Sequence, residues 1–168
     1  MIPQLYFLRS SEQKIVTDML KHAYVEDTPN LNIYSDFYGL TAKDLGLYAL
    51  VDNHIAGAIW SRRLNSEHNS TAFVDEKTPV LSVAVLPEFR AKGVGTFMMD
   101  QFLQEAGALY EQLSVGVLNN SKTIKFYKKF GFEIVDNSEQ KIITMIKKLE
   151  KKEVFRPTDG YDPTKWMD

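Results

Sequence analysis

One strand–turn–helix segment constrains the fold of this chain more than any other, namely VAVLPEFRAKGVGT at residues 83–96. An apolar strand runs through a proline turn into an Arg-x-x-Gly-x-Gly loop, which opens a long amphipathic helix. The two glycines allow the backbone to approach a ligand, and the first N–H groups of a helix have no partners inside it. A phosphate could accept from those N–H groups, and the helix dipole would add attraction. We therefore expect a loop that binds an anion.

The spacing of this loop excludes the two commonest phosphate-binding loops. A P-loop needs Gly-Lys-Ser/Thr, whereas Gly95 is followed by Thr96 and Phe97. A dinucleotide fingerprint needs a third glycine at position 98, which is Met98. The segment instead resembles the acetyl-CoA-binding motif of the GCN5-related N-acetyltransferase (GNAT) family, Arg/Gln-x-x-Gly-x-Gly/Ala after an apolar strand. A tight turn without a ligand is the alternative interpretation.

A second segment resembles the later motif of the same family. Asn119-Asn120-Ser121 is followed by Phe126-Tyr127-Lys128-Lys129-Phe130-Gly131-Phe132. In that family an asparagine after a splayed strand touches the cofactor, and a helix carries a tyrosine before a Gly-Phe turn. The resemblance covers residues 45–149 and fits residues 1–44 loosely. We expect a GNAT domain over residues 1–149 and a tail over residues 150–168, which is either frayed or anchored by Phe155, Tyr161 and Trp166.

The composition fits one globular domain and excludes several other classes. The 168 residues are 44% hydrophobic and 25% charged, with no cysteine, which is compatible with the cytoplasm. No apolar run approaches the roughly twenty residues that span a bilayer. The three histidines form no ligand pair, so we expect no metal, and a net charge of −2 argues against nucleic acid. A homodimer is compatible with the sequence.

Charge is divided unevenly along the chain. Residues 1–89 hold 7 Lys+Arg and 11 Asp+Glu, and residues 90–168 hold 13 and 11. These signs would suit an anionic cofactor on one side and a cationic amine acceptor on the other. Ordinary solvated surface charge is the alternative interpretation.

Hydrophobic periodicity predicts an α/β fold. Strands are expected at residues 5–8, 45–51, 55–64, 80–85, 113–117, 132–135 and 141–149. Helices are expected from a cap at 10–13 to about 24, at 94–110 and at 121–130, with a further short helix within 31–40. The second helix should bury Val94, Phe97, Met98, Phe102, Ala106 and Leu109. This order implies three α/β/α layers, and the resemblance implies the acyl-CoA N-acyltransferase fold with a mixed central sheet of six or seven strands.

The resemblance implies transfer of the acetyl group of acetyl-CoA to a primary amine by direct attack in a ternary complex. The residues expected to bind acetyl-CoA are Val83, Ala84, Val85, Arg90, Ala91, Lys92, Gly93, Val94, Gly95, Thr96, Asn119 and Lys122. The loop backbone would hold the pyrophosphate, and the strand edge would pair with the pantetheine arm. Arg90 and Lys92 could equally be solvated cations, and Asn119 could instead cap the next helix.

One tyrosine and two carboxylates are candidates for acid–base chemistry. Tyr127 occupies the family's tyrosine position and would protonate the leaving thiolate, unless it only packs. A backbone N–H near Val85 would stabilise the oxyanion. Many relatives carry a glutamate where this chain has Leu81, Ser82 and Val83. The remaining carboxylate candidates are Glu76 and Asp75, just before that strand, which could act through water, with a solvated loop as the alternative.

The missing strand glutamate bears on the acceptor. A lysine-like amine of pKa about 10.4 costs about 4.6 kcal/mol to deprotonate at pH 7, but an α-amine near pKa 8 costs only about 1.4 kcal/mol. We therefore expect a small-molecule or peptide amine of lowered pKa, or a base from elsewhere. Aromatic residues within 24–38 would give the acceptor site a partly apolar wall. The alternatives are an acetyl-CoA-binding regulatory module without efficient catalysis, and transfer of another acyl group or to a non-amine acceptor.

Overall fold

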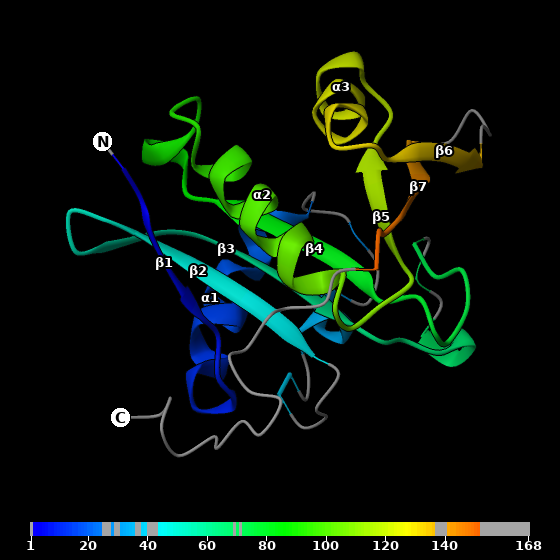
Figure 1. Ribbon diagram of the computed structural model, residues 1–168, viewed down its shortest axis with the longest axis horizontal. Coiled ribbons are helices and arrows are strands. Elements are labelled where there is room, and N and C mark those ends of the chain that lie inside the picture. The colour runs from blue at the N-terminus through cyan, green and yellow to red at the C-terminus, as the bar shows by residue number, and fades with distance from the viewer. Residues whose placement is uncertain are drawn as a thin grey trace.

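The computed structural model describes residues 2–24, 28, 31–35, 38–39, 44–68, 70, 72–136 and 141–151. Its framework is a mixed seven-stranded sheet in the order β1-β2-β3-β4-β5-β7-β6 (Figure 1). The strands are β1 (Gln4–Phe7), β2 (Leu45–Val51), β3 (His54–Arg62), β4 (Val80–Val85), β5 (Gln112–Leu118), β6 (Glu133–Asp136) and β7 (Ile142–Lys148). The α-helices are α1 (Gln13–Ala23), α2 (Val94–Ala106) and α3 (Ser121–Lys129), and the 3-10 turns are η1 (Ser10–Glu12), η2 (Leu31–Tyr34), η3 (Ser66–His68) and η4 (Pro87–Phe89).

The predicted order of strands and helices is confirmed, with most boundaries within two residues. Local signals explain several of them. Asp52 and Asn53 both have positive φ, 51° and 66°, as the tight turn between β2 and β3 requires. Gly131, with φ of 91°, follows the end of α3. The expected tail falls almost wholly outside the described residues, as do its three anchor residues.

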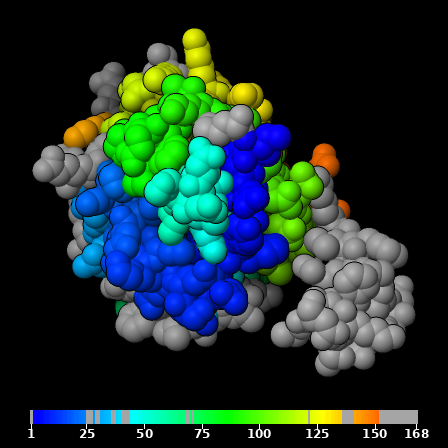
Figure 2. All heavy atoms as spheres, turned by 90° about the vertical axis from the view of Figure 1, so that its left-hand side faces the viewer, coloured from blue at the N-terminus to red at the C-terminus, as the bar shows by residue number. Residues whose placement is uncertain are grey.

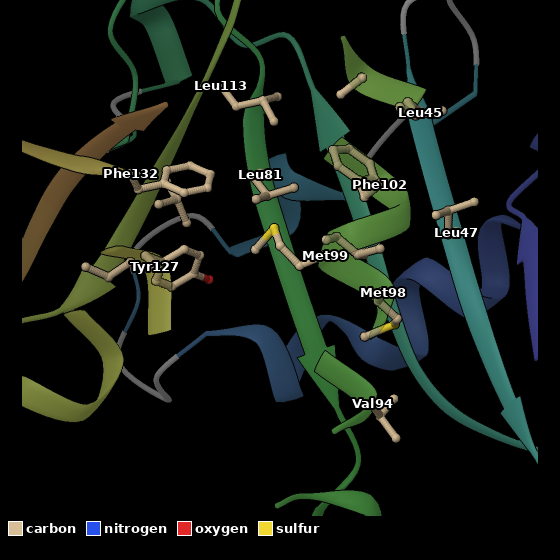
Figure 3. Close-up of a cluster of buried hydrophobic side chains, with 14 of the residues drawn as sticks. Leu45, Leu47, Leu81, Val94, Met98, Met99, Phe102, Leu113, Tyr127 and Phe132 are labelled. Carbon is tan, nitrogen blue, oxygen red and sulfur yellow. The ribbon is translucent and has the colours of Figure 1, made fainter. Parts of the chain in front are cut away.

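Helices cover both faces of the sheet, as the three-layer prediction requires. Helix α1 packs over β3 and β4, and its core includes Val16, Leu20 and Trp60. Helices α2 and α3 lie on the other face, where Phe102 and Tyr127 join a second core, part of which Figure 3 shows. The two cores place every layer in contact with the sheet. No described helix has the length and apolar character needed to cross a bilayer.

The buried stripe of α2 differs from its prediction. Val94, Met98, Phe102 and Ala106 are buried as expected, and Met99 joins them. Phe97 and Leu109 are instead 41% and 40% exposed. The helix ends at Ala106, where the Gly107 N–H donates to Leu103 O, so Leu109 lies in a turn beyond it. Phe97 lies beyond the edge of the stripe because the apolar face is centred on Met98 and Met99.

Figure 2 shows the face at which β1 forms one edge of the sheet. The segment of η4 and the glycine loop (green) reaches this surface beside the β2–β3 turn (cyan). Residues 90–93 of that loop are all exposed. The loop before α2 is therefore open to solvent.

Candidate active site

Strands β4 and β5 meet at one end and separate toward the other. They are parallel neighbours, but only Val80 and Ser114 are paired, and the Ser114 N–H donates to Pro79 O at 3.0 Å. Beyond this point β4 stays paired with β3 through Val85, and β5 stays paired with β7 through Leu118. The two strands diverge in Figure 1. The sheet therefore has a gap at the C-terminal ends of β4 and β5.

Beyond Val80, the edge of β4 that faces this gap is not paired with a neighbouring strand. The Leu86 N–H donates to Ala56 O at 2.8 Å, on the β3 side. Since successive peptide groups of a strand point to opposite sides, the N–H groups of Val83 and Val85 point into the gap. The Val85 carbonyl accepts from Arg90 Nε at 3.0 Å. Ala84 is 1% exposed, and its side chain packs in the α1-face core.

The glycine loop leaves space at the N-terminus of α2. Gly93, the N-cap, has φ of 82°, and no side chain caps the helix. A Cβ atom on Gly93 would have nothing within 4 Å. One on Gly95 would lie 3.6 Å from the Phe126 ring and 3.7 Å from Val85 Cγ2, at ordinary contact distance. Neither glycine is therefore required by contacts within the protein. The space beside the two glycines, together with the free amides of the first helical turn, fits a phosphate-bearing ligand.

A cavity of about 750 Å³ occupies the gap. This volume lies within the usual range of roughly 300–1,000 Å³ for small-molecule sites. Its walls come from both faces: His22, Tyr24 and Tyr34 on the α1 side, and Lys122, Phe126 and Tyr127 on α3. Val83, Val85 and Leu118 line the strands between them, and Arg90 and Lys141 add positive charge. The structure thus brings five predicted residues into one cavity: Val83, Val85, Arg90, Lys122 and Tyr127.

The remaining cofactor candidates lie around the cavity rather than in its wall. Ala91 (φ 60°) and Lys92 are exposed in the loop before Gly93, and Thr96 is half-buried in the first turn of α2. Val94 is 1% exposed and packs in the core, so only its backbone faces the loop. These residues lie near the cavity because the glycine loop runs beside the gap.

Asn119 and Asn120 have separate places in the structure. Asn119 is exposed at the end of β5, and its N–H donates to Lys141 O at 2.8 Å. Asn120 caps α3, because its Oδ1 accepts from the Thr123 N–H at 2.9 Å. The alternative role of Asn119 as the helix cap is therefore wrong.

Glu76 is not brought to the cavity. It is exposed in the turn that precedes β4, at the end of the strand opposite Val85. Its neighbour Asp75 fixes that turn, since Oδ1 accepts from the N–H groups of Lys77 and Thr78 at 2.8 Å. Hydrogen bonds, first that with the Thr78 side chain, hold the pKa of Asp75 below its usual value. Both carboxylate candidates from the sequence, Glu76 and Asp75, therefore lie apart from the gap.

Tyr127 lies in the wall of the cavity with most of its ring buried. It is 8% exposed and packs edge-on against Phe126 and Phe132, at centroid distances of 5.2 and 5.4 Å. Figure 3 shows its hydroxyl group directed from α3 toward β4. Burial raises the pKa of Tyr127 above its ordinary value, so the phenol stays protonated.

The opposite wall is a pair of stacked tyrosines. The rings of Tyr24 and Tyr34 are 4.3 Å apart at 20°. The hydroxyl groups of Tyr24 and Ser82 lie 2.5 Å apart, and those of Tyr34 and Ser70 lie 2.7 Å apart. Burial, with smaller contributions from Tyr34 and Tyr127, raises the pKa of Tyr24 well above its usual value. The sequence predicted an aromatic wall here, but it could not predict the contact with Ser82, 58 residues away.

Interactions from β3 hold this wall in place. Trp60, fully buried, donates from Nε1 to Tyr34 O at 2.7 Å. Arg62 donates from Nη1 to Ile33 O at 3.0 Å. Because both bonds end on η2, they fix the position of the Tyr34 ring against Tyr24.

His22 is a lining residue that the sequence analysis missed. It lies half-buried in the last turn of α1. The histidines were considered only as metal ligands, and across the described ranges no cluster of three or more His, Cys, Asp or Glu could hold a metal ion. Its position two residues before an aromatic segment at a predicted helix end was the available signal.

Comparison with known proteins gives one consistent picture. A family model described as "Acetyltransferase (GNAT) domain" matches residues 43–134. The chain is 32% identical over 104 residues to the "Probable N-acetyltransferase san" of Drosophila melanogaster, covering 60% of this chain and 53% of that protein. It is 26% identical over 113 residues to "N-alpha-acetyltransferase 50" of Danio rerio, covering 66% and 62%. The matches thus span less than two thirds of these relatives.

Solved structures show the same fold. The phosphinothricin acetyltransferase of Sinorhizobium meliloti, solved in complex with AcCoA, superposes with a TM-score of 0.64 at 18% identity, covering 97% of each chain.

Proposed function

This chain belongs to the GNAT acetyltransferase family, and from that premise we propose that it transfers the acetyl group of acetyl-CoA to a primary amine by direct attack in a ternary complex. The observation that carries the proposal is the gap between β4 and β5, which opens into a cavity beside the glycine loop of α2. Because the gap joins both faces of the sheet, two substrates can meet there from opposite sides.

Acetyl-CoA would lie on the α2 and α3 side. The amides of Val94, Gly95 and Thr96 would donate to the pyrophosphate, with positive charge from Arg90 and Lys122 nearby. The pantetheine amides would pair with the open edge of β4, as an added strand does. The exposed loop residues Ala91, Lys92 and Gly93 and the β5-end residue Asn119 would contact the cofactor at its rim.

The chemistry needs a donor for the oxyanion and an acid for the leaving thiolate. The Val85 N–H points into the gap and would donate to the thioester oxygen as it gains negative charge. Tyr127 would give a proton to the sulfur. A tyrosine of ordinary pKa about 10 is a weaker acid than a thiol of about 8.5, and burial weakens Tyr127 further, so its assistance is partial in the transition state.

The acceptor is proposed to be an α-amine of a peptide or small molecule. An α-amine near pKa 8 is about 3 kcal/mol easier to deprotonate at pH 7 than a lysine side chain. Strand β4 supplies no carboxylate, since Leu81, Ser82 and Val83 occupy the positions where relatives carry a glutamate. The name of the Danio rerio relative, N-alpha-acetyltransferase 50, is in line with this choice.

One experiment separates an enzyme from a binding module. Acetyl-CoA affinity is measured by calorimetry, and thiol release is followed with unblocked tetrapeptides and with α-acetylated lysine peptides. We expect binding and thiol release that depends on the unblocked peptides. Binding without amine-dependent release would favour an acetyl-CoA-binding regulatory module. Absence of binding would overturn the proposal.

A further inference from the structure

We infer that His22 is the general base of this reaction and takes a proton from the ammonium group of the acceptor. The inference rests on the proposed function, and it supplies the base that β4 lacks. No role for His22 follows from the motifs that identify the family, because residue 22 lies outside residues 43–134.

The position of His22 puts it on the acceptor side of the gap. Helices α2 and α3 share one face of the sheet, and the glycine loop and Tyr127 are on that face. His22 reaches the cavity from α1, on the opposite face, beside Tyr24 and Tyr34. With acetyl-CoA bound along the glycine loop, the amine must approach from the α1 side, where His22 lies.

The other titratable groups of the cavity wall cannot act as a base at neutral pH. Among described residues these are Tyr24, Tyr34, Arg90, Lys122, Tyr127 and Lys141. Arginine and lysine are ordinarily protonated, and burial raises the pKa of the tyrosines. An imidazole ordinarily titrates near pH 6.5, so it can accept a proton at pH 7.

His22 lies in the last turn of α1 together with Lys21. The carboxylate one turn earlier, Asp18, is paired with Lys14 at 2.6 Å, and Lys21 is exposed. The α1 carboxylate nearest to His22 in the sequence is therefore already engaged in an ion pair.

In the proposed acetyl transfer, every proton and every bonding pair has a stated donor and acceptor. The acceptor ammonium gives one proton to His22, and the amine lone pair then forms the N–C bond to the thioester carbonyl. The C–S bond breaks as the carbonyl re-forms, and the sulfur leaves with the bonding pair. Tyr127 protonates that sulfur and is restored by the second proton lost from nitrogen. His22 releases its proton to solvent.

The test compares His22→Gln with the matched control His54→Gln, whose histidine is exposed at the β2–β3 turn outside the cavity. At pH 7, His22→Gln should lower kcat/KM for an unblocked tetrapeptide about 100-fold or more, with acetyl-CoA affinity unchanged. The deficit should shrink to within about tenfold at pH 9.5, where the α-amine is already neutral. Added imidazole should restore activity to His22→Ala, which a merely structural role would not allow. The control should match the wild type.

The outcomes separate the two claims. If the wild type is active and His22→Gln has the same rate and pH profile, the base assignment is overturned and the proposed function stands. A deficit that is equal at every pH and insensitive to imidazole would also overturn it. A wild-type protein that transfers no acetyl group would overturn both.

Discussion

Replacing Gly95 with alanine should weaken acetyl-CoA binding without weakening the fold. The new Cβ would lie between Val85 and Phe126, both in the cavity wall, at distances of 3.6–3.7 Å that need no rearrangement. Alanine is favoured over glycine inside a helix by up to about 1 kcal/mol, so the ligand-free variant should be as stable as the wild type or slightly more stable. The methyl group would instead displace the ligand from the amides of the first turn.

The size of the binding loss follows from the hydrogen bonds at stake. A hydrogen bond to a charged group is worth about 1.5–3 kcal/mol, so losing one raises the Kd for acetyl-CoA about 10- to 150-fold. Calorimetric titration measures the affinity, and urea denaturation of the ligand-free protein measures the stability. Gln104→Ala, an exposed change on the same helix, is the matched control and should alter neither.

Gly93→Ala gives the complementary result. Its Cβ would meet nothing, but φ of 82° lies in the left-handed region and should cost about 1–2 kcal/mol of stability.

An unchanged Kd in Gly95→Ala would refute the role given to the glycine loop. A loss of stability in Gly95→Ala would show that this glycine serves packing instead.

Three further predictions concern the walls of the cavity and the core. Tyr127→Phe should lower kcat at least tenfold and leave acetyl-CoA affinity nearly intact; an unchanged rate in steady-state assays would remove Tyr127 from the mechanism. Trp60→Phe should destabilise the protein by about 2–4 kcal/mol in urea, because it leaves the buried Tyr34 carbonyl without its donor and creates a void; a change below 1 kcal/mol would contradict this. Burial raises the pKa of Tyr110 from 10 to about 12, so its stabilisation is complete below pH 10 and is lost as pH rises toward 12. The part of the 295-nm absorbance change that is missing in Tyr110→Phe should therefore appear together with loss of circular dichroism. Reversible ionisation of Tyr110 near pH 10 with the fold intact would disprove the burial argument.

Local sequence signals were sufficient for most of the framework. Val80–Val85 was predicted to the residue, since a short apolar run between turn signals is typical of a buried strand. The helix expected over residues 121–130 ends just before the left-handed Gly131, which is a similarly local signal. The strand and helix order then fixed the layers.

The features that the sequence left open, missed or predicted wrongly depend on contacts that no local pattern records. Phe97 and Met99 are close in sequence, and only the packing of α2 on the sheet decides which is buried. Asn119 and Asn120 are chemically identical, and the exit of the chain from β5 decides which caps α3. His22 joins the cavity only through the tertiary position of α1.

The lone pairing of Val80 with Ser114 divides the sheet into two ladders, β1–β4 and β5-β7-β6, with scarcely any backbone hydrogen bonds between them. Regions with few backbone hydrogen bonds between them can differ in their free energies of local unfolding, even where they share a core as these two do. A cosubstrate that contacts both ladders would stabilise both of them when it binds. Amide hydrogen exchange along β5 and β7 should then slow when acetyl-CoA is present, even at amides that no ligand atom touches.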